Sequence, residues 1–188
     1  MPTNDIMIDL ETLSLKPNAM ILSIGAVMFD AEIGNIGAQL HIGCVMYGQG
    51  RDLDRDVVKW WAEPKQKAAY DEIMMFVQQK PYRLDLALAA LSRFIVKHNP
   101  KQIWGNSPSF DLSILANAYQ QHDMTMPWPF WNERDTRTIV NVCRQLTGVD
   151  PKKQIEFDGT AHSALADAIY QARYVIAAYQ LLASRSAV

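Results

Sequence analysis

The stretch that decides the fold is Asp5-Ile6-Met7-Ile8-Asp9-Leu10-Glu11-Thr12-Leu13-Ser14-Leu15, near the start of the chain. Its apolar residues predict a buried strand, and its alternation places Asp9 and Glu11 together on one face, opposite the apolar side chains of the other face. Two carboxylates buried side by side lose their hydration and repel each other. The pair therefore favours a metal site, and the alternative is an edge strand with a solvated polar face.

The composition is that of an ordinary globular protein, with 49% hydrophobic and 20% charged residues, and the length fits one domain over residues 1–188. No apolar run reaches the roughly 18 residues of a membrane span, and the first residues lack a signal-peptide pattern, so we expect a cytoplasmic protein. The net charge of -2 argues against a general basic nucleic-acid binder. If four acids hold metal, however, the 18 basic residues outnumber the remaining acids. Cys44 and Cys143 are far apart and predict neither a zinc site nor a disulfide.

The rest of the chain predicts strands first and then mainly helices. Apolar runs at 20–29 and 36–45 are joined to the first strand by short turns, so the three strands form an antiparallel meander. A short strand is expected at 102–105, and Pro127 to Trp131 form an aromatic loop or short strand. Helical spacing predicts helices at about 53–61, 65–78, 81–98 with Pro81 at its start, 110–122, 135–146 and 163–183. This order gives a mixed sheet with helices on both faces.

Three separated pieces carry acidic or basic groups to strand ends or helix starts: the Asp9 and Glu11 pair, Asp111 after Phe110, and His162 with Asp167. Such positions display functional groups in α/β proteins. Each piece has a plainer interpretation, since Asp111 could cap its helix and the last two could be surface residues. On a continuous helix His162 and Asp167 would lie about 140° apart. They converge only if His162 lies on the turn that enters the helix.

The order Asp9-x-Glu11, Phe110-Asp111 and His162-x-x-x-x-Asp167 resembles the three motifs of the DEDDh exonucleases in the ribonuclease H-like superfamily. That family includes oligoribonuclease, ribonuclease T and bacterial proofreading subunits. The segments 9–13, 58–61 and 134–138 are most similar to a phage and bacterial branch of 3′-5′ exonucleases, labelled exodeoxyribonuclease VIII-like or exoribonuclease. Ser163 occupies the position of the tyrosine that marks the sister group, whereas His162 fits the histidine group.

The resemblance implies a ribonuclease H-like fold, with a mixed five-stranded sheet in which parallel strands follow the meander and helices cover both faces. It implies hydrolysis of single-stranded or short DNA or RNA at the 3′ end, which releases nucleoside 5′-monophosphates. Two Mg2+ or Mn2+ ions would be bound, with Asp9 bridging both. The other ligands would be Glu11, Asp111 and Asp167. His162 would take the proton from the attacking water, a task suited to the ordinary pKa of histidine.

The same resemblance places Thr12, Leu13 and Phe110 against the terminal nucleotide, with Leu13 as an apolar wedge between bases. Either Trp60 or Trp61 could stack on a base, and we expect Trp61 at the site, although both could pack in the core. The chain has Leu-Ser where many relatives have Thr-Gly. Asp135 is assigned to helix capping. Relatives often form homodimers. The alternatives are a non-catalytic nucleic-acid-binding module with the same fold, and a structural protein whose acids are caps and surface groups.

Overall fold

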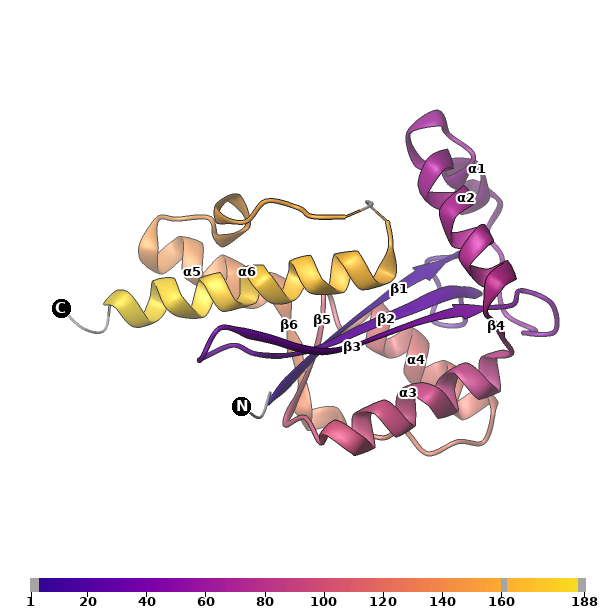
Figure 1. Cartoon of the computed structure of the whole chain (residues 1–188), viewed down its shortest axis with the longest axis horizontal. Helices are drawn as coiled ribbons and strands as arrows, with labels where there is room; N and C mark the ends of the chain where they lie inside the picture. Colours follow the sequence, from indigo (N-terminus) through magenta and orange to yellow (C-terminus); the bar gives the residue numbers. More distant parts are fainter. Residues whose placement is uncertain (1–3, 160–161, 186–188) are drawn as a thin grey trace.

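The computed structural model describes residues 4–159 and 162–185, in which a six-stranded mixed sheet has the order β4-β3-β2-β1-β5-β6 (Figure 1). The predicted antiparallel meander of the first three strands is confirmed, and β5 runs parallel to β1 with β6 parallel to β5. The strands are β1 (Asp5–Thr12), β2 (Ile21–Asp30), β3 (Asn35–Cys44), β4 (Pro81–Tyr82), β5 (Gln102–Gly105) and β6 (Glu133–Asp135).

The helices follow the predicted order, but the third begins at a different residue than expected. They are α1 (Arg55–Trp61), α2 (Pro64–Gln79), α3 (Leu84–His98), α4 (Asp111–Gln121), α5 (Thr136–Thr147) and α6 (Ala164–Arg185), with 3-10 turns η1 (Phe130–Asn132) and η2 (Pro151–Gln154). The prediction that Pro81 opens a helix is wrong. Pro81 and Tyr82 instead pair with Gly43 and Cys44 as a short parallel edge strand. Proline is tolerated at such an edge, and this pairing makes the sheet six-stranded rather than five-stranded.

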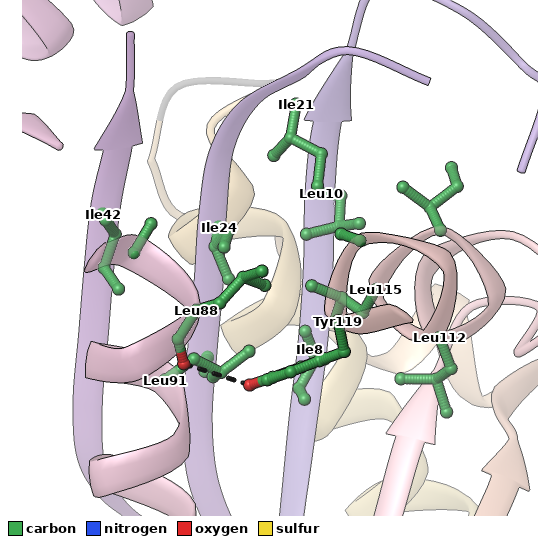
Figure 2. Close-up of a cluster of buried hydrophobic side chains, with 14 of the residues drawn as sticks. Ile8, Leu10, Ile21, Ile24, Ile42, Leu88, Leu91, Leu112, Leu115 and Tyr119 are labelled. Atoms are coloured by element: carbon green, nitrogen blue, oxygen red, sulfur yellow. Dashed lines mark hydrogen bonds between the residues drawn. The ribbon is translucent and has the colours of Figure 1, made fainter. Parts of the chain in front are cut away.

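Side chains alternate along β1 as predicted, and each face is covered by a different pair of helices. Ile6, Ile8 and Leu10 belong to a core with α3 and α4, where the Tyr119 hydroxyl donates to the Leu88 carbonyl at 3.1 Å (Figure 2). Met7 belongs to a second core with α5 and α6 on the opposite face (Figure 1). Because the odd-numbered side chains share the Met7 face, Asp9 and Glu11 lie on the α6 side.

A third apolar cluster holds α1 and α2 beyond the carboxyl end of β1 (Figure 1). Leu13 and Leu22 from the sheet side pack with Trp61 of α1 and with apolar residues of α2. The Trp61 indole N–H donates to the Thr12 carbonyl oxygen at 3.0 Å, which fixes α1 against the end of β1. The two helices thus form a wall beside the end of the strand that carries the acidic pair.

Among the described residues, no helix is both long enough and apolar enough to cross a membrane.

Candidate active site

The first two predicted pieces meet at the carboxyl half of β1. Glu11 is 8% exposed and Asp111 only 3% exposed. Asp111 is the first residue of α4 and follows the N-cap Phe110; its Oδ1 accepts a hydrogen bond from the Leu10 backbone N–H at 3.2 Å. The Asp111 side chain therefore reaches across to the β1 backbone at Leu10, the residue between Asp9 and Glu11 in the sequence.

The third piece arrives from the start of α6. His162 has a left-handed backbone with φ of 63°, directly before the helix, and the Asp167 N–H donates to the Ser163 carbonyl at 2.8 Å in its first turn. His162 thus lies on the entering turn, as convergence requires. One potential ligand atom each from Glu11, His162 and Asp167 lies within 4.8 Å of the others. The structure therefore brings residues from β1 and α6 together, although more than 150 positions separate Glu11 from His162.

Gly25 on β2 allows this convergence, and sequence reasoning did not single it out. It is the antiparallel partner of Asp9. A Cβ atom at this position would lie 2.1 Å from the Ala164 carbonyl carbon and 2.3 Å from the Leu165 backbone nitrogen. Only glycine lets the backbone of α6 lie directly on the sheet here. A glycine inside an otherwise apolar strand was the available signal of this close approach.

Burial raises the pKa values of all four acids, and neighbouring carboxylates add to the rise at Asp9 and Glu11. Burial, and then the charges of Asp111 and Asp167, raise the pKa of Asp9 well above its usual range. Burial and the Asp9 charge do the same to the pKa of Glu11. Burial raises the pKa of Asp111 to about 7, although the hydrogen bond from the Leu10 N–H lowers it in part. Burial also raises the pKa of Asp167, with the nearby His162 opposing the shift.

No direct ion pair with lysine or arginine compensates these acids within the described chain, although the charge of Arg137 lowers the pKa of Asp111. None of its lysines or arginines forms an ion pair with the four carboxylates. The only side-chain donor hydrogen-bonded to Asp9 among the described residues is neutral, the Gln171 amide, whose Nε2 donates to Oδ1 at 2.7 Å. Sequence reasoning missed Gln171 too; its position four residues after Asp167 on the same helix face was the signal. A cluster of oxygen ligands without a counter-cation suits hard divalent ions such as Mg2+ or Mn2+.

A hollow of about 530 Å³ adjoins the acids, between the end of β1 and α1. Predicted substrate residues Thr12, Phe110 and Trp61 line it. Trp61 is only 2% exposed, and it packs edge to face with the more exposed Trp60, at 5.0 Å between ring centroids. Trp60 therefore offers more free ring surface to the hollow than Trp61. Its ring also meets the His162 ring edge to face at 5.0 Å. The full lining is Leu10, Glu11, Thr12, Leu15, Asp54, Asp56, Val57, Trp60, Trp61 and Phe110.

The expectation that Leu13 contacts the substrate must be corrected. Leu13 is 2% exposed and belongs to the apolar cluster under α1 and α2, and it does not line the hollow. Leu15, two residues later, is 73% exposed and does line the hollow. The reason is the turn after β1, where the Thr12 hydroxyl donates to the Ser14 carbonyl at 2.8 Å. This turn buries Leu13 and presents Leu15.

Clustered carboxylates beside an open hollow are typical of enzymes that act on phosphate esters, which include nucleases and phosphatases. Within this class, residues 4–179 match the sequence model of the family described as the 3′-5′ exoribonuclease Rv2179c-like domain. The chain belongs to this family and is a 3′-5′ exonuclease. No curated protein sequence matches it.

Solved structures share the fold. The nuclease domain of 3′hExo, a DEDDh family member bound to rAMP, aligns with a TM-score of 0.60 at 13% identity, over 96% of this chain and 92% of that chain. A 3′-exonuclease that recognises the histone mRNA stem-loop aligns with a TM-score of 0.65 at 14% identity, over 98% and 84%. Exonuclease I aligns with a TM-score of 0.66 at 15% identity, over 96% of this chain and 43% of the exonuclease I chain. This chain thus spans less than half of exonuclease I. The predicted fold is confirmed, and it is shared with a DEDDh family member.

Proposed function

We propose that the protein is a metal-dependent exonuclease that removes nucleoside 5′-monophosphates from the 3′ ends of single-stranded or short nucleic acids. The observation that carries this proposal is the convergence of Glu11, His162 and Asp167 within 4.8 Å, beside Asp9 and Asp111. Mutually repelling, mostly buried carboxylates destabilise a metal-free fold, so a purely structural role for them is unfavourable. Bound cations would remove that repulsion.

Two Mg2+ or Mn2+ ions would be held by the oxygen donors of this set, with Asp9 at its centre. Glu11, Asp111 and Asp167 would supply the remaining protein oxygens. When bound, the ions would acidify a water molecule and stabilise the leaving 3′ oxygen. The carboxylates repel a phosphate directly, so they would hold it next to His162 only through the bound cations.

His162 acts in this proposal as the general base. It would take a proton from the water that attacks phosphorus, while the bond between phosphorus and the 3′ oxygen of the preceding nucleotide breaks. That oxygen then gains a proton and becomes the new 3′ hydroxyl. The edge contacts of the His162 ring with Trp60 and Trp61, at 5.0 and 5.9 Å, support this role because they restrain the ring next to the acids.

The terminal nucleotide would occupy the hollow beside the acids. Leu15, Phe110 and Trp60 offer the apolar surface that a base or sugar needs, and Thr12 and Glu11 line the same hollow. Stacking on an aromatic ring contributes about 1 to 3 kcal/mol per base and tolerates any sequence. The family description names an exoribonuclease, and similar folds are described with rAMP, single-stranded DNA or an RNA stem-loop, so we infer RNA as the first substrate to test.

The test uses matched RNA and DNA oligonucleotides labelled at the 5′ end, each with a free or a blocked 3′ end. We expect stepwise shortening from free 3′ ends with Mn2+ or Mg2+, none with EDTA, and severe loss in Asp9→Asn and His162→Ala variants. Full activity of Asp9→Asn, or unchanged activity in EDTA, would refute the proposal. Tight binding of the oligonucleotide without any shortening would instead identify a non-catalytic binding module.

A further inference from the structure

Gln171 joins α6 to the central acid of the site by a direct hydrogen bond. Its Nε2 donates to Asp9 Oδ1 at 2.7 Å, and the Gln171 side chain is only 5% exposed. It follows Asp167 by four residues, so both side chains lie on the same face of α6 and point toward β1. The close approach of α6 over Gly25 brings this face within reach of Asp9.

The chemistry of the amide suits a support for a metal-binding carboxylate. A lysine or arginine here would neutralise Asp9 and weaken its attraction for cations, whereas an acid would add to the repulsion. A neutral N–H donor fixes one oxygen and leaves the negative charge in place. When Asp9 is ionised, as metal binding requires, the amide nitrogen must face it, because the amide oxygen and the carboxylate are both acceptors.

The other end of the amide has no competing partner in the described chain. Gln171 Oε1 is buried and accepts no hydrogen bond, and the Tyr174 hydroxyl, nearly one helical turn further along α6, is also buried and unpartnered. The orientation of the Gln171 amide therefore depends on Asp9. Conversely, the Gln171 amide is the only hydrogen-bonding side chain that restrains the Asp9 carboxylate among the described residues.

We infer that Gln171 is a positioning residue that holds the Asp9 carboxylate in the orientation required for binding two divalent ions. The inference rests on the proposed metal-dependent function. Groups that hydrogen-bond to metal ligands commonly change metal affinity or activity by about 10- to 100-fold when they are removed. Gln171 would change metal affinity by a factor in this range, and it would do so through Asp9, without contacting the substrate.

The test compares wild type with Gln171→Met, which keeps the length of the side chain and loses the donor. Gln180→Met, an exposed glutamine on the same helix, is the matched control. Mn2+ binding is measured by calorimetry without substrate. We expect affinity about 10- to 100-fold lower in Gln171→Met and unchanged in Gln180→Met. The Mn2+ concentration for half-maximal hydrolysis should rise in parallel, with the KM for an oligonucleotide unchanged.

These readouts separate positioning from a general structural role. A merely structural glutamine would lower the unfolding temperature or raise KM, and the Mn2+ requirement of the folded enzyme would stay the same. If Gln171→Met does not fold, Gln171→Asn, which is one methylene shorter and cannot reach Asp9, gives the same comparison. Wild-type Mn2+ affinity in whichever variant folds would overturn the inference. Absence of both Mn2+ binding and hydrolysis in wild type would instead refute the proposed function.

Discussion

Replacing Asp111 with asparagine should make the metal-free protein more stable at pH 8. The folded pKa of Asp111 is raised from 3.8 to about 7, so the folded protein holds a proton that the unfolded chain has already lost in this interval. For such a group, stability is greatest below the unfolded pKa and falls as pH rises toward the folded pKa. Above about pH 7 Asp111 is ionised in the folded protein too, and its buried charge then lowers the stability of the fold by the full amount.

The pKa of Asp111 is raised by about 3 pH units, so its ionisation lowers the free energy of unfolding by at most ~4 kcal/mol. Neighbouring acids can take up a proton in its place, so we expect roughly half of this, ~2 kcal/mol, or an increase of about 4 to 8 °C in unfolding temperature. Asparagine has no charge to bury, and its Oδ1 can still accept the hydrogen bond from the Leu10 N–H.

The assay is thermal unfolding in EDTA at pH 5 and pH 8. Asp71→Asn is the control, because Asp71 is exposed and forms its ion pair with Lys67 on the surface of α2. The advantage of Asp111→Asn should be complete at pH 8 and about a third of that at pH 5, which lies only about one unit above the unfolded pKa, and the control should show none. With Mn2+ the order should reverse, since the variant lacks one ligand and should also lose hydrolysis. Equal unfolding temperatures of wild type and Asp111→Asn at pH 8 in EDTA would refute the reasoning.

Three further predictions concern the metal and the walls of the site. Mn2+ at 100 times its dissociation constant should stabilise wild type by about 2.7 kcal/mol in thermal unfolding, and EDTA should reverse this; a metal-independent unfolding temperature would contradict it. Gly25→Ala should lower the free energy of unfolding by at least the ~1 to 3 kcal/mol typical of overpacking and should abolish activity, because its Cβ would meet the Ala164 backbone at 2.1 Å. A wild-type melting curve would contradict this close packing. Leu13→Ala should lower the free energy of unfolding by about 2 to 5 kcal/mol, measured by chemical unfolding. Leu15→Ala should change it by less than about 0.5 kcal/mol and should raise the KM for oligonucleotides. The opposite pattern would restore Leu13 as the substrate contact.

Local chemistry made several elements predictable. Asp135 was expected to cap the helix that Gly148 ends, and its carboxylate accepts from the Arg137 and Thr138 N–H groups at 3.1 Å. Gly148 has the left-handed backbone that such an end requires, with φ of 73°. The start of α3 was not predictable in this way. Pro81 is compatible with a first helical turn and with an edge strand, and only its pairing partner Gly43, far away in sequence, decides between them.

The sequence by itself determined the strand that carries Asp9 and Glu11, and the order of the acidic and histidine motifs, because alternation and spacing are properties of the local chain. Only the tertiary structure decided which further groups, beyond Asp111, His162 and Asp167, surround that pair. Leu15 rather than Leu13 faces the hollow because of a turn, and α6 approaches Asp9 because Gly25 has no side chain. Gln171 supports Asp9 because 162 positions of chain fold back onto β1. Such contacts depend on packing between distant segments, which no local pattern specifies.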